Sequence, residues 1–124
     1  MAAFLYVGLG GFVGAALRYG VTLGAAALMW RGHWATLTVN ALGSLLIGFL
    51  APYFESPSHP ARLFLVVGVL GGFTTFSSFS LDTLTLLNGK ETGLALLNVF
   101  LNVAVCLAFV WCGFKTAPGV LSDI

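Results

Sequence analysis

The residues of this chain that could do chemistry gather at positions 71–80, inside an apolar stretch covering residues 63–87. Two adjacent glycines, two adjacent threonines and three serines stand there, and glycine and threonine are poor helix formers. Their concentration in the middle of a membrane-length segment indicates a break in the helix. Carbonyls freed by such a break can replace water around a cation. Alternatively, Gly71 and Gly72 only allow close helix packing, with the hydroxyls bonding back to their own helix.

Polar side chains also recur every four residues in two other apolar segments, so each set follows one face of a helix. The two sets are Thr36, Asn40 and Ser44, and Asn98, Asn102 and Cys106. Such groups often only hydrogen-bond a neighbouring helix, at about 0.6 kcal/mol each. Polar groups inside a membrane are costly, however, and tend to be functional. These two sets, called here the polar tracks, would in so small a chain also suit a narrow path lined by polar side chains.

Composition places the chain in a membrane. Its 124 residues are 59% hydrophobic and 7% charged, with a mean hydropathy of +1.02, whereas about 25% of residues in soluble domains are charged. A net charge of +1 gives no indication of nucleic-acid binding. We expect a single domain over residues 1–124, embedded in the lipid bilayer.

Four apolar segments, each long enough to cross a bilayer, are separated by short polar stretches. They cover residues 3–29, 34–54, 63–87 and 92–114. Loops this short make consecutive helices antiparallel, so both termini are expected on one side. The predicted fold is an all-α membrane protein of four transmembrane helices, with the third broken near its middle.

The first segment contains two pairs of glycines at a spacing that suits close helix contact. These are Gly10 with Gly14, and Gly20 with Gly24.

The histidines and cysteines are not predicted to form a site. His33 and His59 fall in predicted loops, where a solvated position is expected. Cys106 and Cys112 are six residues apart on one helix and point in different directions, so no disulfide is expected between them.

The basic residues that flank the segments are balanced between the two sides of the membrane. One side carries Arg62 and Lys115, and the other carries Arg31 and Lys90, so the positive-inside rule gives no orientation. Either the balance arises by chance and the chain inserts one way, or the chain inserts both ways. Insertion both ways would allow an antiparallel dimer with its two-fold axis in the membrane plane.

Three stretches of sequence carry a family resemblance. They are GGFVGAALRY at residues 10–19, TLTVNALGS at residues 36–44 and GGFTTFSSFS at residues 71–80. In this order they resemble the Fluc family of fluoride channels, the CrcB proteins, and the resemblance covers nearly the whole chain. It implies a fluoride-selective channel in the inner (plasma) membrane that lowers cytoplasmic fluoride by passive export. It also implies a dual-topology, antiparallel homodimer.

The resemblance implies roles for individual residues. Phe76 and Phe79 would line the fluoride path with their positive ring edges, although such a pair on a membrane helix is usually core or lipid contact. Asn40 matches a residue that faces the pore. The backbone carbonyls of Gly71 and Thr74 would hold a structural sodium ion at the dimer centre. The other residues predicted on the pathway are Asn102, Ser77 and Arg18.

The chain departs from the family's pattern at several positions. Asp82 stands where the family more often has Glu. Where many members have Ser or Thr and a nearby Tyr, this chain has Asn98, Asn102 and Cys106. Arg18 matches an arginine that attracts anions at a vestibule. Arg18 and Asp82 are the two charges predicted well within the spanning segments, and they either pair or extend to opposite interfaces.

No nucleophile, base and orienting group converge in the sequence, and no metal-ligand cluster or phosphate loop occurs, so we predict no enzyme. The alternative to a channel is a small dual-topology, proton-coupled drug transporter. That class relies on a membrane-embedded Glu in its first helix, and residues 3–29 contain no carboxylate. A third possibility, a non-transporting assembly subunit, would leave the polar tracks and the helix break unexplained.

Overall fold

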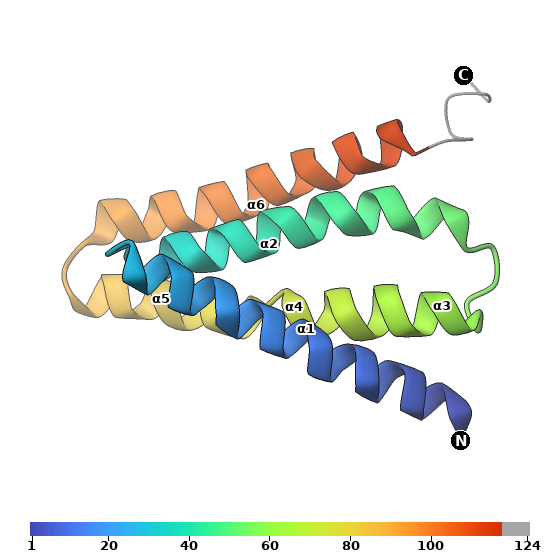
Figure 1. Ribbon diagram of the computed structural model, residues 1–124. Coiled ribbons are helices and arrows are strands. Elements are labelled where there is room, and N and C mark those ends of the chain that lie inside the picture. Colours follow the sequence, from blue (N-terminus) through green and yellow to red (C-terminus); the bar gives the residue numbers. More distant parts are fainter. Residues whose placement is uncertain (118–124) are drawn as a thin grey trace.

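The computed structural model describes residues 1–117, which form helices and no strands (Figure 1). The first half contains α1 (Ala2–Ala27), α2 (Gly32–Leu50) and a 3₁₀ turn, η1 (Ala51–Tyr53). A third stretch joins α3 (Pro60–Arg62), the π-helical η2 (Leu63–Leu70), α4 (Gly71–Phe73) and α5 (Phe76–Asn88). The last helix is α6 (Thr92–Thr116).

Four stretches of the described chain are helical, long and apolar enough to cross a membrane. They are Ala2–Ala27, Gly32–Tyr53, Pro60–Asn88 and Thr92–Thr116. Successive stretches run in opposite directions, so the start of α1 and the end of α6 lie at the same end of the bundle (Figure 1). The prediction of an all-α membrane protein with four spanning helices is confirmed.

The third stretch is helical on both sides of two extended residues. The backbone is continuously helical from Pro60 to the end of α4 at Phe73. Thr74 and Thr75 are extended, with ψ angles of 156° and 116°. The hydroxyl of Thr75 accepts the Ser78 N–H at 3.1 Å and thereby caps the start of α5. Gly71 and Gly72 themselves are helical.

α1 packs against η2 and α4, and close backbone approach makes this possible. A Cβ on Gly14 would overlap the carbonyl oxygen of Val69, and a Cβ on Gly10 would overlap that of Phe64. A Cβ on Gly20 or Gly24 would meet no atom of the described residues within 4 Å. Only the first of the two glycine pairs in α1 therefore makes the close helix contact that the spacing predicts.

Glycines also set the contact between α2 and α6, which lie side by side along the bundle (Figure 1). A Cβ on Gly48 would overlap the carbonyl oxygen of Val110, and a Cβ on Gly113 would overlap that of Leu45. Small residues such as Ala35 are part of the buried interior, while many large side chains such as Phe12 and Phe100 are exposed. An apolar exterior of this kind suits contact with lipid or with another chain.

An ion pair joins the two connections at one end of the bundle. Arg31, between α1 and α2, donates to both carboxylate oxygens of Glu91, between α5 and α6, at 2.8 and 2.5 Å. These hydrogen bonds hold the pKa of the Glu91 carboxyl below its usual value. Both side chains are exposed, so the pair adds little stability by itself. It does show that the two connections lie next to each other.

The prediction of a solvated loop position for His33 is wrong. The extended Arg31 precedes α2, which begins at Gly32, so His33 lies in its first turn and turns inward. Its side chain is 4% exposed, and Nε2 has no hydrogen-bond partner among the described residues. His59 is exposed as predicted, and its Nδ1 accepts the Ala61 N–H. Cys106 and Cys112 are free thiols, as predicted.

Replacing Gly14 by Ala tests the contact between α1 and the third stretch. We expect Gly14→Ala to destabilise the protein by about 1–3 kcal/mol, because the backbone oxygen that the new methyl group meets cannot move aside easily. The measurement is the thermal unfolding midpoint of the purified protein in detergent. Gly20→Ala, on the same helix and facing open space, is the control and should be tolerated. Equal unfolding midpoints for the two variants would contradict this packing.

Candidate functional site: an uncharged hollow beside the helix interruption

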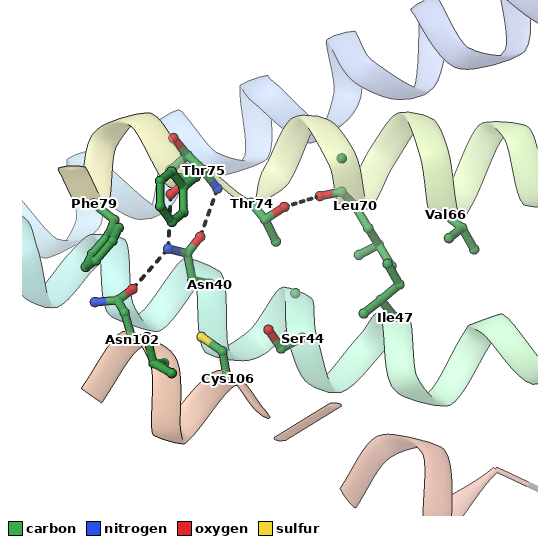
Figure 2. Close-up of a pocket in the computed structure, with 14 residues that line it drawn as sticks. Asn40, Ser44, Ile47, Val66, Leu70, Thr74, Thr75, Phe79, Asn102 and Cys106 are labelled. Atoms are coloured by element: carbon green, nitrogen blue, oxygen red, sulfur yellow. Dashed lines mark hydrogen bonds between the residues drawn. The ribbon is translucent and has the colours of Figure 1, made fainter. Parts of the chain in front are cut away.

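A hollow of about 390 Å³ lies beside the two extended threonines, between α2, α6 and the third stretch (Figure 2). One part of its wall is apolar, and another carries side-chain amides, hydroxyls and a thiol. None of its lining residues is charged. The lining residues include Asn40, Ser44, Ile47, Val66, Leu70, Gly71, Thr74, Thr75, Phe76, Phe79, Asn102 and Cys106.

The Asn40 side chain satisfies the backbone of Thr75 where the helix is interrupted. Its Oδ1 accepts the Thr75 N–H at 2.8 Å, and its Nδ2 donates to the Thr75 carbonyl oxygen at 3.1 Å (Figure 2). Both polar groups of a buried, extended residue are thus paired by one amide. Unpaired backbone groups inside a membrane cost several kcal/mol each. The Asn40 amide therefore makes the interruption tolerable at this depth.

The predicted polar tracks of α2 and α6 meet at the hollow. Asn40 Nδ2 also donates to Asn102 Oδ1 at 3.1 Å. Asn102 Nδ2 in turn donates to the side-chain and backbone oxygens of Asn98 at 3.1 and 3.0 Å. Asn98 and Asn102 are buried, so these bonds matter for stability as well as for position.

Among the carbonyl groups that lose their usual helical partners at the interruption are those of Gly71 and Thr74. In a continuous helix the Thr75 N–H would bond to the Gly71 carbonyl, but it bonds to Asn40. The Ser78 N–H would bond to the Thr74 carbonyl, but it bonds to the Thr75 hydroxyl. Gly71 and Thr74 both line the hollow. Backbone carbonyls released in this way are ligands of the kind that small cations take in channels.

The two phenylalanines at the hollow differ in exposure. The rings of Phe76 and Phe79 are 5.2 Å apart between centroids and tilted by 59°, which is a favourable aromatic geometry. Phe79 is buried at 9% exposure, whereas Phe76 is 77% exposed. Both line the hollow, so on the surface of the single chain its wall ends at the exposed ring of Phe76.

Two of the residues predicted on the pathway do not line the hollow. The Arg18 side chain donates from Nε to the carbonyl oxygen of Gly72, two residues before the interruption, at 3.2 Å. Ser77 is exposed, and its hydroxyl lies 3.2 Å from the Thr75 hydroxyl. Asp82 accepts a hydrogen bond from Thr36 at 2.6 Å. The alternative in which Arg18 pairs with Asp82 is therefore not what the structure contains.

Thr75 and Thr83 also make hydrogen bonds at the site, although neither was predicted to have a role of its own. Thr75 caps α5 through its hydroxyl, which accepts the Ser78 N–H. Threonine is a preferred residue at this position, so the start of α5 could have been recognised from the sequence. The Thr83 hydroxyl donates to the Phe79 carbonyl at 2.8 Å and accepts from Asn98 at 3.0 Å. Its link to Asn98 joins α5 to α6, and the sequence carries no signal for it.

The chain matches known proteins over nearly its full length. Residues 5–114 match the family described as CrcB-like protein, Camphor Resistance (CrcB). A protein of Elusimicrobium minutum named fluoride-specific ion channel FluC is 52% identical over 120 residues, which is 95% of each chain. A protein of the same name from Thermus thermophilus is 49% identical over 118 residues, which is 93% of this chain and 94% of its own. Clostridium perfringens has another, 42% identical over 91% of each chain.

The matched region contains the hollow, the two extended threonines and the core of all four spanning stretches. The resemblance carried by residues 10–19, 36–44 and 71–80 is thus confirmed along the whole membrane-embedded part. This multi-pass membrane protein belongs to the CrcB family, whose members are similar to it over almost its entire length.

Proposed function

We propose that this protein is a fluoride channel of the inner (plasma) membrane, through which the anion leaves the cytoplasm passively. The observation that carries the proposal is the identity of about half of all residues, over nearly full length, with proteins named fluoride-specific ion channel FluC. The function is that of a channel rather than an enzyme. A proton-coupled drug transporter is not favoured, because α1 contains no carboxylate.

The chemistry of the hollow suits a small anion that must bind weakly and leave quickly. Its lining offers amide N–H groups and aromatic ring edges, and no charged side chain. A fixed cation in a narrow path would hold the anion too tightly for rapid release. In the structure both donors of Asn40 are engaged, so an anion binding there would compete with the Thr75 carbonyl or with Asn102.

We place Asn40, Phe76, Phe79 and Asn102 on the fluoride path because all four line the hollow. Ser77 and Arg18 are proposed to act next to it rather than within it. The Ser77 hydroxyl is held near that of Thr75, and Arg18 is tied to Gly72. A guanidinium held two residues before the interruption adds positive potential without direct contact with the anion in the hollow.

We further propose that the functional unit is an antiparallel homodimer. A single chain leaves the hollow open beside Phe76, which is 77% exposed. A second copy of the chain would cover this ring and close the path. Arg31 and Lys90 at one end of the bundle balance Arg62 and Lys115 at the other, which supports insertion in both orientations.

The interruption at Thr74 and Thr75 is proposed to be the functional break of the third spanning helix, and to hold a structural sodium ion at the dimer centre. The carbonyls of Gly71 and Thr74 fit such an ion, because they border the hollow without their helical donors. These two oxygens would not complete the coordination of such an ion, so the partner chain would supply the rest. A bound cation would lower the cost of bringing an anion nearby.

Ion efflux from liposomes that contain the purified protein tests the proposed function. We expect rapid loss of trapped fluoride and little loss of trapped chloride, each followed with an ion-selective electrode. The control is liposomes without protein. No efflux of either anion, with the protein shown to be correctly reconstituted, would refute the channel.

Chemical labelling tests the antiparallel arrangement. Cys106 and Cys112 are replaced by Ser, and Thr116→Cys then places one thiol at the end of α6. A membrane-impermeant thiol reagent should label about half of the protein from each side of the membrane, because both orientations are expected in equal numbers. Labelling from one side only would show that the chain inserts in a single direction.

Isoleucine substitutions test whether the aromatic edges matter for conduction. Phe76→Ile and Phe79→Ile keep apolar bulk but remove the positive ring edge. A loss of 1.36 kcal/mol in barrier stabilisation reduces the rate tenfold, so we expect each variant to assemble and to conduct fluoride about tenfold more slowly or worse. The readout is fluoride efflux at equal amounts of reconstituted dimer.

Two phenylalanines of matched exposure serve as controls for these variants. Phe73 is buried at 8% exposure in the same stretch and matches Phe79. Phe12 is 74% exposed on α1 and matches Phe76. Neither lines the hollow, so Phe73→Ile and Phe12→Ile should change fluoride efflux far less. Similar efflux from all four variants would show that the ring edges play no part.

A further inference from the structure

Hydrogen bonds around the hollow form a continuous series, called here the hydrogen-bond chain, in which every donor points the same way. The Thr75 N–H donates to Asn40, Asn40 donates to Asn102, and Asn102 donates to Asn98. Asn98 donates to the Thr83 hydroxyl, which donates to the Phe79 carbonyl. The hydrogen-bond chain thus leaves the third stretch at the interruption, crosses α2 and α6, and returns to α5 one turn later.

The direction of this hydrogen-bond chain is fixed at both ends, because the group at one end can only donate and the group at the other can only accept. A backbone N–H can only donate, so Asn40 must turn Oδ1 toward Thr75. At the other end, the Phe79 carbonyl can only accept, so it takes the single proton of the Thr83 hydroxyl. Thr83 is then able only to accept from Asn98. Hydrogen bonds in such a row also strengthen one another.

The consequence for Asn40 follows one residue at a time. Because Thr83 accepts, Asn98 must present Nδ2 to it and Oδ1 to Asn102. The backbone carbonyl of Asn98 also accepts from Asn102 Nδ2. Asn102 therefore presents Oδ1 to Asn40, which must offer Nδ2 in return. A flipped Asn40 amide would set its oxygen against the Asn102 oxygen and the Thr75 carbonyl. In an anion path, such a flip would also present an oxygen where a donor is needed.

We propose that Thr83 and Asn98 are positioning residues that help to hold the donor side of the Asn40 amide toward Asn102 and the fluoride path. Neither residue lines the hollow, so they act through Asn102 and Asn40 and not by touching the anion. This inference rests on the proposed function as a fluoride channel. The orientation of the amide itself can be measured independently of conduction.

Three substitutions on one helix separate this role from ordinary packing. Thr83→Val keeps the shape of the side chain but removes the hydroxyl at the end of the chain. Thr83→Ser restores a hydroxyl. Thr85→Val is the matched control, because the Thr85 hydroxyl also donates to its own helix, at Leu81, but receives no bond from an amide.

The experiment measures fluoride efflux from liposomes and the NMR signals of the Asn40 side-chain NH₂ group, identified by their loss in Asn40→Ala. Thr83→Val should lower fluoride efflux about fivefold, the effect of losing one net hydrogen bond, and should shift the Asn40 signals. Thr83→Ser should return both readouts to those of the original protein, and Thr85→Val should leave both unchanged. If Thr83→Val does not assemble, Thr83→Ala decides by the same readouts.

Two results would overturn the inference. In one, Thr83→Val assembles, and neither the Asn40 signals nor the efflux change. In the other, Thr85→Val changes both readouts as much as Thr83→Val does. If the original protein carries no fluoride at all, the proposed function fails, and the NMR comparison still decides whether Thr83 and Asn98 orient Asn40.

Discussion

The pairing between the Asn40 side chain and the backbone of Thr75 is the interaction on which the site depends. Two hydrogen bonds from one amide replace those that the helix loses when Thr74 and Thr75 become extended. Without them, a buried N–H and a buried carbonyl would lack partners inside a membrane, which is prohibitive there. The same two bonds leave the Gly71 carbonyl without its helical donor and place Phe76 and Phe79 at the start of α5.

The rest of the fold holds that pairing in place by close helix contact. Gly10 and Gly14 let α1 approach the helical part of the third stretch, and Gly48 and Gly113 let α2 approach α6. Arg18 reaches from α1 to the Gly72 carbonyl and fixes the last turn before the interruption. The resulting hollow has amides and hydroxyls beside an apolar wall, and none of its lining residues is charged, which suits weak and rapid binding of a small anion.

Sequence patterns predicted the spanning segments and the family, because membrane length and a long motif are strong signals. In the structure Gly71 and Gly72 are helical, and the extended residues are Thr74 and Thr75. Composition could not single these two residues out, because it is the side chain of Asn40 that satisfies the Thr75 backbone.

Tertiary partners account for the other differences between sequence and structure. Helical spacing put polar side chains on single faces but could not say that Asn40 meets Asn102, or that Asp82 meets Thr36 and not Arg18. His33 was expected in solvent because its neighbours are polar, but α2 begins at Gly32 and turns the ring inward. These contacts join residues that are far apart in the sequence, where local pattern carries no information.

Hydrogen exchange at the Thr75 backbone amide tests the central pairing most directly. Exchange is followed by NMR in the original protein and in Asn40→Ala. The Thr74 N–H, which bonds to the Leu70 carbonyl at 3.0 Å, serves as an internal reference. The Asn40–Thr75 pairing predicts that the Thr75 N–H is protected in the original protein and exchanges on the order of tenfold faster or more in Asn40→Ala, while Thr74 stays protected. Unchanged protection of Thr75 in Asn40→Ala would contradict the role of Asn40 as the support of the interruption.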